Sequence, residues 1–375
     1  MPPLSILLKP ASSACNLNCS YCFYADEARA RAVPDRGVMP GAVSRALIEQ
    51  AALAGEGTVS FLFQGGEPTL AGLDFFRAFA AHVGETFPRS LEVRYAIQTN
   101  GTLLDRDWCR FFRENRFLVG LSLDGTRACH DRFRRDRAGN GTYDRALGAA
   151  RLLERAGVEY NVLTVVTGRL ARDPGGVFAS LCQQGFRFQQ YIPCLEPLGR
   201  TWDQAGCSLS PEEYGAFLKA LFDLWYQELE RGRYWSIRLF DNLVWMLAGG
   251  PPELCSMAGR CSRQYMVEAD GDVYPCDFYG LDAFRLGNIL QNAWAELDAA
   301  RDRLGFIQSS LPVPEACRRC RWHPLCRNGC RRERRMEGNR PGRSRWCEAY
   351  AAFLPYALPR LHQAERLLLR GGGAL

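Results

Sequence analysis

The segment Cys15-Asn16-Leu17-Asn18-Cys19-Ser20-Tyr21-Cys22 contains three cysteines in the spacing C-x3-C-x2-C. Three thiolates can hold three irons of a [4Fe–4S] cluster and leave the fourth iron without a protein ligand. A structural zinc site, by contrast, is normally closed by four protein ligands. The spacing therefore favours an iron–sulfur cluster with one open iron, and it indicates chemistry on a molecule bound at that iron.

The chain of 375 residues has 16 cysteines, and eight of them are crowded into its last third. The N-terminus, Met1-Pro2-Pro3-Leu4, has neither the basic segment nor the apolar core of a signal peptide. We therefore expect a cytoplasmic protein in which the clustered cysteines bind metal rather than form disulfides. No apolar run approaches the ~20 residues that a membrane-spanning helix needs, so no membrane partner is expected.

Short segments rich in Val, Ile, Leu and Phe alternate with amphipathic segments in the first half of the chain. The expected strands are 4–8, 59–63, 93–98, 119–123, 161–166 and 187–192, and the expected helices between them are 42–54, 74–85, 105–114, 143–156 and 176–184. This alternation predicts an α/β fold with parallel strands and right-handed crossovers. Six units favour a partial (β/α)6 barrel that resembles an incomplete TIM barrel, although a doubly wound sheet would show the same alternation.

Polar residues gather where three of the expected strands end. They are Gln64-Gly65-Gly66-Glu67-Pro68, Gln98-Thr99-Asn100-Gly101 and Ser122-Leu123-Asp124-Gly125. Any one of these segments could be simple turn chemistry. Ligands bind at the carboxyl ends of parallel strands, so three such segments beside the cysteine motif favour a lined pocket.

The composition changes after Ile192-Pro193. Residues 199–211 are loop-like, 212–230 form a long amphipathic helix, and 255–347 are rich in cysteine with little periodicity. We expect a last helix over 350–369 that Pro355 and Pro359 interrupt. The predicted domains are a barrel over 1–235, a cysteine-rich domain over 236–348, and a terminal helix and tail over 349–375.

The formal net charge is +6, and much of it comes from arginines near the late cysteines, in 318–321 and 331–335. One interpretation is a nucleic-acid-binding patch. The other is compensation for anionic thiolate-ligated clusters. Because the overall excess is modest and no RNA-binding motif is present, the second interpretation is preferred and no nucleic-acid partner is expected.

The C-x3-C-x2-C motif with Tyr21 beside its last cysteine resembles the signature of radical S-adenosylmethionine (radical SAM) enzymes. The resemblance implies that the open iron binds S-adenosylmethionine, which is cleaved to methionine and a 5′-deoxyadenosyl radical. It also implies cofactor-binding roles for a set of residues, although Arg134 could instead be one solvated charge of an Arg-rich loop. The implied residues are Tyr21, Gly66, Glu67, Ser122, Arg134 and Leu195.

The late cysteines resemble the SPASM domain of that superfamily. The resemblance implies two further [4Fe–4S] clusters, making three in all, and two zinc sites are the competing interpretation. One cluster is implied to have the ligands Cys255, Cys261, Cys276 and Cys330, and the other Cys317, Cys320, Cys326 and Cys347. Four thiolates saturate each cluster, so neither should bind substrate directly. We expect both to carry electrons or anchor structure.

Nearly the whole chain resembles the anaerobic sulfatase-maturating enzymes, most clearly in 63–72, 98–102 and 273–279. That family implies oxidation of a cysteine or serine to Cα-formylglycine, within a Cys/Ser-x-Pro/Ala-x-Arg motif of an unfolded sulfatase. A flavodoxin- or ferredoxin-type protein is the expected reductant. Asp277 matches the position of the family's base, with a structural turn Asp as the alternative. Tyr24, Gln64 and Gln98 are candidates for peptide contacts.

Two other functions remain open at this point. One is a SPASM maturase that forms a thioether or other crosslink in a ribosomally made peptide. Such enzymes often begin with a peptide-recognition domain, and only 14 residues precede Cys15 here. The other is a non-catalytic iron–sulfur or zinc-binding protein, which would not explain the open three-cysteine motif.

Overall fold

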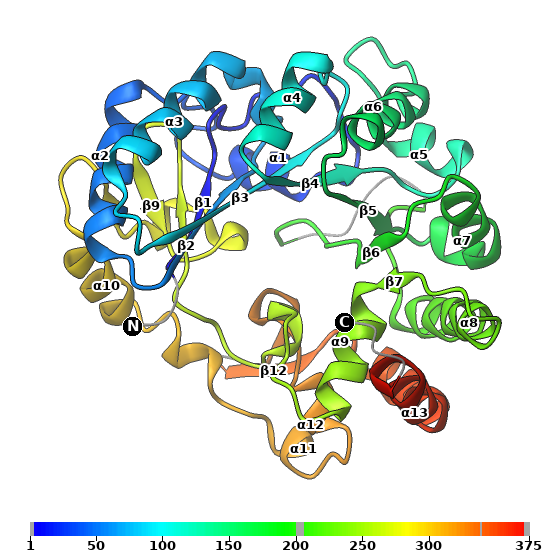
Figure 1. Ribbon diagram of the computed structural model, residues 1–375. Coiled ribbons are helices and arrows are strands. Elements are labelled where there is room, and N and C mark those ends of the chain that lie inside the picture. The colour runs from blue at the N-terminus through cyan, green and yellow to red at the C-terminus, as the bar shows by residue number, and fades with distance from the viewer. Residues whose placement is uncertain (1–3, 200–205, 338–339, 371–375) are drawn as a thin grey trace.

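Six parallel strands follow the chain order in the sheet and form a partial barrel (Figure 1). They are β1 (Leu4–Leu8), β2 (Thr58–Phe63), β3 (Glu92–Thr99), β4 (Phe117–Ser122), β5 (Tyr160–Val166) and β6 (Phe188–Pro193). The structure is a computed structural model that describes residues 4–199, 206–337 and 340–370. Each strand pairs in parallel with the next. A doubly wound sheet reverses its strand order at a switch point. The order seen here is that of a barrel, so the predicted fold class is confirmed.

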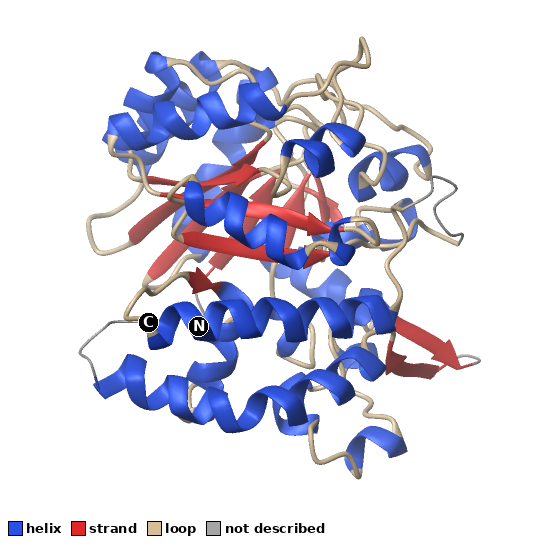
Figure 2. Ribbon diagram, turned by 90° about the vertical axis from the view of Figure 1, so that its right-hand side faces the viewer, coloured by secondary structure: helices blue, strands red, loops and turns tan. Residues whose placement is uncertain are grey.

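Helices that follow the strands cover the outside of the barrel (Figures 1 and 2). They are α2 (Gly41–Ala54), α3 (Leu73–Thr86), α4 (Arg106–Glu114), α6 (Tyr143–Ala156), α7 (Pro174–Gln183) and α8 (Pro211–Glu230). Local sequence explains where they begin. Asp105 accepts hydrogen bonds from the first turn of α4, and Ser210 and Glu213 form a capping box on α8. Phe61, Val119 and Leu121 are fully buried between sheet and helices.

The helices α1 (Phe23–Arg29) and α5 (Arg127–Phe133) were not predicted. Each has only seven residues, which is too short for its apolar periodicity to be recognised. Both lie at the carboxyl-terminal side of the barrel, because α1 follows the cysteine motif and α5 follows the loop after β4. Their positions therefore matter for the site.

The cysteine-rich region continues the barrel sheet instead of standing apart from it. Strand β7 (Ser236–Ile237) pairs with β6, and at the other edge β8 (Tyr265–Val267) pairs in parallel with β1, followed by β9 (Asp272–Tyr274) and β10 (Gly287–Asn288). The rest of the region contains α9 (Arg238–Leu247), α10 (Trp294–Arg303), α11 (Glu315–Arg318), α12 (His323–Cys326) and the hairpin β11 (Arg334–Glu337) and β12 (Arg340–Ser344). The domain limits at residues 235 and 348 stay a prediction.

The last helix, α13 (Cys347–Arg370), runs through both prolines. The predicted interruption at Pro355 and Pro359 is therefore wrong. The two prolines are four residues apart on the exposed side, while Phe353 and Leu361 on the other side are fully buried. A proline on the solvent side of a helix bends it toward the core without breaking it when tertiary packing holds both halves. Here α13 packs against α8 and α9.

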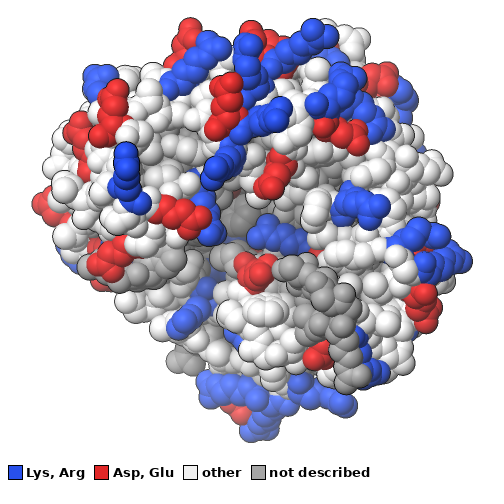
Figure 3. Space-filling view, viewed as in Figure 1, with Lys and Arg blue, Asp and Glu red and all other residues white. Residues whose placement is uncertain are grey.

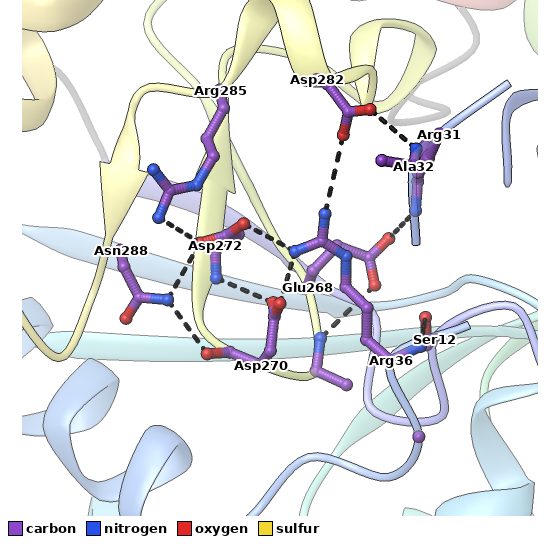
Figure 4. A network of polar contacts seen from close by, with 12 residues as sticks. Ser12, Arg31, Ala32, Arg36, Glu268, Asp270, Asp272, Asp282, Arg285 and Asn288 are labelled. Atoms are coloured by element: carbon purple, nitrogen blue, oxygen red, sulfur yellow. Dashed lines mark hydrogen bonds and ion pairs between the residues drawn. The ribbon is translucent and has the colours of Figure 1, made fainter. Parts of the chain in front are cut away.

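A network of charged residues ties the loop after α1 to the hairpin of β8 and β9 (Figure 4). Arg36 forms ion pairs with Asp270 and Asp272, and the distance from Arg36 Nη1 to Asp272 Oδ2 is 2.6 Å. Asp272 also pairs with Arg285 at 2.7 Å and accepts a hydrogen bond from Asn288 at 3.0 Å. The barrel and the cysteine-rich region are thus joined by polar contacts as well as by the sheet. No helix in the described ranges is long and apolar enough to cross a membrane.

Candidate active site

The three N-terminal cysteines lie in the loop between β1 and α1, at the carboxyl end of the barrel. Cys22 is the N-cap of α1, and its sulfur accepts a hydrogen bond from the backbone N–H of Ala25. Burial raises the pKa of the Cys15 thiol to about 11 and that of Cys19 to about 12. A site that disfavours bare thiolates gains from a cation that binds them, because metal ligation requires the deprotonated sulfur. The three thiols fit a cluster.

The Gly-Gly-Glu-Pro segment supports this loop from behind. The Gly66 N–H donates to Ser12 O at 2.9 Å, and a Cβ at position 66 would lie 2.0 Å from the carbonyl oxygen of Ala14. Only glycine allows the two backbones to approach so closely. Gly66 therefore holds the residues just before Cys15 in place. Its predicted contact with the cofactor stays a prediction.

Glu67 is buried and its carboxylate binds donors from the loop after β3. Thr99 Oγ1 donates to one carboxylate oxygen at 2.7 Å, and the backbone N–H of Asn100 donates to the other at 2.8 Å. Thr69 contributes its own N–H and hydroxyl. Burial raises the pKa of Glu67, and these hydrogen bonds oppose the increase. Three of the four donors bind the same oxygen, so the second oxygen keeps acceptor capacity for a bound ligand.

Arg134 finds its partner in Asp124, in the loop after β4. The Arg134 Nε lies 2.9 Å from Asp124 Oδ2, and both side chains are almost completely buried. The Tyr21 hydroxyl donates to the same carboxylate, and the Arg134 guanidinium lies 5.3 Å from the centre of the Tyr21 ring. Arg134 is thus not a solvated charge. Sequence reasoning placed Asp124 among the polar strand-end residues but assigned it no role, and it missed that Asp124 orients both Arg134 and Tyr21.

Asp277 lies at the start of a single 3-10 turn directly after Cys276, facing the end of the barrel. Lys9 Nζ forms an ion pair with one of its oxygens, and Gln64 Nε2 donates to the other at 2.8 Å. Lys9 follows β1 and is fully buried, whereas the Asp277 side chain is 15% exposed. The carboxylate is therefore held by two strands' ends and remains accessible to a bound molecule.

Lys9 was missed as a site residue, although the sequence does contain a signal for it. Arginine supplies nearly all of the 47 basic residues, and the chain has only two lysines, Lys9 and Lys219. A lysine is a compact charge that a single carboxylate can pair with inside a protein. Its rarity in an arginine-rich chain could have drawn attention to residue 9.

Tyr24 lies under this ion pair, on α1. Lys9 Nζ is 4.0 Å from the centre of its ring, and its hydroxyl donates to buried Glu268. Arg31 also pairs with Glu268 and donates to the carbonyl of Gly280. These contacts fix Tyr24 beside the predicted base. A direct peptide contact by Tyr24 stays a prediction.

Glu27, one turn further along α1, is a second buried carboxyl group near Asp277. It is 1% exposed, and neither of its carboxylate oxygens has a hydrogen-bond partner among the described residues. Burial, helped by the charge of Asp277 and opposed by that of Lys9, raises its pKa to about 8. Glu27 is thus protonated at neutral pH. Nothing in its sequence context indicated this.

The remaining predicted residues lie around the same end of the barrel. Ser122 is the last residue of β4 and is buried, and Gln98 is half-buried near the end of β3. Leu195 follows β6 and lines a cavity of about 310 Å³ together with Arg332 and Arg345 of the cysteine-rich region. Roles for these residues stay predictions.

The late cysteines fall into two groups in space. Thiols of one group lie close enough to affect one another's ionisation. Burial raises the pKa of Cys276 most, and the neighbouring thiols of Cys330 and Cys255 also raise it. Burial likewise raises the pKa of Cys317 most, and the neighbouring thiols of Cys347, Cys326 and Cys320 also raise it. The first group is Cys255, Cys261, Cys276 and Cys330, and the second is Cys317, Cys320, Cys326 and Cys347. The structure therefore brings together the two sets that the SPASM resemblance implies.

The chemistry of these thiols bears on the metal. Four thiolates are the protein ligands of a [4Fe–4S] cluster. Burial raises the pKa of thiols in both groups, so they gain from a metal group that binds their ionised form. The donor sets therefore fit [4Fe–4S] clusters.

Comparisons with known proteins agree with this geometry. Residues 10–174 match the radical SAM superfamily, and residues 255–321 match an iron-sulfur cluster-binding domain, SPASM. A cysteine-type anaerobic sulfatase-maturating enzyme of Clostridium novyi is 42% identical over 371 residues, which cover 98% of this chain and 99% of the relative. The chain belongs to the anaerobic sulfatase-maturating enzymes.

Two further comparisons place the chain within this family. A serine-type enzyme of Bacteroides thetaiotaomicron is 29% identical, with 98% of this chain and 92% of the relative covered. A solved structure, native anSMEcpe with bound AdoMet and Cp18Cys peptide, has a TM-score of 0.91 and 42% identity, and the match covers 97% of this chain and 99% of that one. This anaerobic sulfatase-maturating enzyme is thus a radical SAM oxidoreductase that uses S-adenosylmethionine and [4Fe–4S] clusters.

Proposed function

We propose that this enzyme oxidises a cysteine in a Cys-x-Pro/Ala-x-Arg motif of an unfolded sulfatase to Cα-formylglycine. Cysteine is preferred to serine because identity to the cysteine-type relative is 42% and to the serine-type relative 29%. Peptide as the substrate is supported by the solved relative, which holds AdoMet and a peptide. The near-full-length match supports this function over crosslinking of a ribosomal peptide and over a non-catalytic metal protein.

Cys15, Cys19 and Cys22 would hold the N-terminal cluster, which together with bound S-adenosylmethionine would supply the radical chemistry that removes one hydrogen atom from the substrate Cβ. In this proposal Tyr21, Gly66, Glu67, Ser122, Arg134 and Leu195 form the cofactor pocket. The Asp124–Arg134 pair keeps the guanidinium oriented, and the free acceptor capacity of Glu67 suits an amino group.

Asp277 takes the thiol proton of the substrate cysteine, and this is the step that the chain's own residues perform. The observation that carries the proposal is the Asp277 carboxylate between Lys9 and Gln64, partly open and directly after Cys276. A base must face the proton that it removes at hydrogen-bond distance. Lys9 pairs with the carboxylate and orients it, and Tyr24, Gln64 and Gln98 would contact the peptide.

The atoms and electrons of the reaction balance as follows. The substrate loses a Cβ hydrogen atom, its thiol proton goes to Asp277, and one electron leaves the site, which yields a thioaldehyde. Water then replaces the sulfur, which departs as hydrogen sulfide. Because one electron must enter and one must leave per turnover, we propose a flavodoxin- or ferredoxin-type protein as the external carrier.

The test is anaerobic incubation of the reconstituted enzyme with a Cys-x-Pro-x-Arg peptide, S-adenosylmethionine and a chemical reductant. Loss of two hydrogens and exchange of sulfur for oxygen lowers the peptide mass by about 18 Da. Asp277→Asn should reduce aldehyde formation about 100-fold or more, the usual range for a lost general base, while 5′-deoxyadenosine still forms. Asp282→Asn, in the next turn and half-exposed, is the matched control. Undiminished aldehyde from Asp277→Asn would refute the assignment.

A further inference from the structure

The segment that holds the second group of late cysteines is the most basic part of the chain. Residues 315–347 contain eleven arginines and three glutamates, so they carry a net charge of +8 while the whole chain carries +6. The rest of the protein is therefore slightly acidic. Each [4Fe–4S] cluster with four thiolates contributes about two negative charges. Two clusters would leave about half of this positive charge uncompensated.

The arginines of this segment divide into an inner and an outer set. The inner ones satisfy the protein itself. Buried Arg334 donates to the carbonyls of Ser310 and Gly259, and Arg345 pairs with Glu196 at 3.2 Å. Arg331 packs over the ring of Phe306. These side chains are committed to folding.

The outer set surrounds the second group of cysteines. We call it the distal arginine surface, and it consists of Arg318, Arg319, Arg321, Arg327 and Arg343. The side chains of Arg318 and Arg319 are 66% and 82% exposed, and both pair with Glu315, itself 58% exposed. Figure 3 shows Lys and Arg side chains gathered at the lower end of the molecule, over α11 and α12.

This surface is built around the ligand residues. Arg318, Arg319 and Arg321 flank Cys317 and Cys320 directly in sequence. Arg343 comes from the hairpin strand β12, is exposed, and forms a hydrogen bond with the side chain of Cys347. Residues far apart in the chain thus present positive charge over the same four thiols.

We propose that the distal arginine surface is the docking site for a small acidic electron-carrier protein of the flavodoxin or ferredoxin class. This inference rests on the proposed exchange of single electrons with an external carrier, and it specifies where that carrier binds. Weak electron-transfer complexes have small interfaces and are steered by opposite charge. A compact basic surface over a cluster's ligands meets both conditions.

Two other occupants fit the surface less well. The sulfatase motif carries an arginine of its own, which a basic surface would repel. A nucleic acid would meet the charge, but the sequence has no RNA-binding motif. Figure 1 also places α11 and α12 away from the barrel helices α3, α4 and α6. A carrier bound there leaves the barrel free for substrate.

The experiment measures binding of an oxidised acidic bacterial flavodoxin to the iron-loaded enzyme by biolayer interferometry, at low and at physiological salt. Arg318→Glu with Arg319→Glu should weaken binding about 10-fold at low salt, and salt should weaken wild-type binding similarly, because the attraction is between exposed charges. The control is Arg231→Glu with Arg233→Glu. These arginines also share one carboxylate, Glu228, and are 59% and 55% exposed.

The outcomes separate the docking site from the proposed function. Equal weakening in both double variants, or unchanged binding in Arg318→Glu/Arg319→Glu, would overturn the docking site. Binding of a short DNA duplex as tight as that of flavodoxin would do the same, since it would reveal a general polyanion surface. Measurement of the iron content checks that the Arg318→Glu/Arg319→Glu variant holds its clusters. If that variant loses iron, the Arg318→Gln/Arg319→Gln variant takes its place, and its binding should weaken by a smaller factor. Peptide oxidation driven by dithionite tests the function alone.

Discussion

The barrel and the cysteine-rich region share one sheet but are stabilised by different means. Phe61, Phe63 and Leu121 of the barrel are fully buried in a continuous apolar core between strands and helices. Residues 255–347 contribute to the same core through Tyr265, Val273 and Leu297, but their eight thiols lie mostly in loops and short helical turns. Apolar packing needs no cofactor, whereas a region built on thiols gains its folding free energy when metal binds. The difference predicts that iron matters unequally to the two regions.

Removal of iron should have the largest effect, and it should lower the protease resistance of the cysteine-rich region only. After chelation under mild oxidation, we expect residues 255–347 to become sensitive to protease while the barrel stays resistant, since the barrel core remains intact. Limited proteolysis with mass spectrometry measures both regions in one sample. Reconstitution with iron and sulfide should restore resistance. Loss of protease resistance in both regions at once would contradict this and would show that the two regions unfold as one unit.

Cys19→Ala should abolish catalysis while sparing the cysteine-rich region. We expect S-adenosylmethionine cleavage to fall at least about 1,000-fold and bound iron to fall by about one third, because one of three clusters loses a ligand. Cys109→Ala, at a buried thiol of α4 that contacts the apolar core, is the control and should keep its iron. Iron analysis and 5′-deoxyadenosine formation decide the result. Full iron in Cys19→Ala would contradict it.

Phe63→Ala should destabilise the barrel without loss of metal. Its ring contacts those of Phe76, Phe79 and Phe117, and such a deletion costs about 3–5 kcal/mol of unfolding free energy. Phe188→Ala, on β6 and 59% exposed, should change it by less than about 0.5 kcal/mol. Thermal unfolding under anaerobic conditions provides the measurement. A small effect at residue 63 would mean that the barrel, too, depends on its cluster.

Lys9→Met tests the contact where the two regions meet at the site. The change keeps the apolar stem but leaves Asp277 without its cation. Misplacement of the base should reduce peptide oxidation about 10- to 100-fold, with 5′-deoxyadenosine formation retained. Lys219→Met, at the other lysine of the chain, should retain wild-type turnover. Equal turnover in both variants would show that Gln64 alone positions Asp277.

Glu27→Gln should have the smallest effect, which is a change in how folding stability depends on pH. Burial raises the pKa of Glu27 from 4.5 to about 8, so the folded protein binds a proton that the unfolded chain releases between these values. Stability from this group is therefore full below about pH 4.5 and is lost as pH rises toward 8. Glutamine cannot ionise, so the variant should lose less stability between pH 6 and 8.5 than the wild type. Parallel pH curves of the melting temperature would contradict this.

Much of the barrel could be predicted because its signals are local. The strand at Leu4–Leu8 and the helix at Tyr143–Ala156 have the predicted limits, since apolar periodicity and turn residues mark both ends. The continuous helix α13 could not be predicted, because its prolines are tolerated only through packing against α8 and α9. Strands β8 to β10 have two or three residues each, too few for any periodic signal.

The site shows the same division. The cysteine spacing and the polar strand ends could be recognised as candidate site residues from sequence, because each is a chemical type at a meaningful position, and Asp277 became a candidate through the family resemblance. The roles of Asp124 and Glu27 could not be recognised in this way, and only the rarity of lysine pointed to Lys9, because the roles of all three come from partners 10 to 268 residues away. Whether a buried charge is stabilised depends on the group that it contacts in the folded protein.

The sequence by itself determined the kind of protein: thiol spacing indicates a cluster with an open iron, and alternating apolar segments indicate parallel α/β units. Tertiary structure alone decided between a barrel and a doubly wound sheet, how the eight late thiols divide into two groups, which carboxylate Lys9 pairs with, and which arginines face solvent. The reason is physical. Ligand type and periodicity are properties of short segments, whereas burial and electrostatic partnership arise only when distant segments meet.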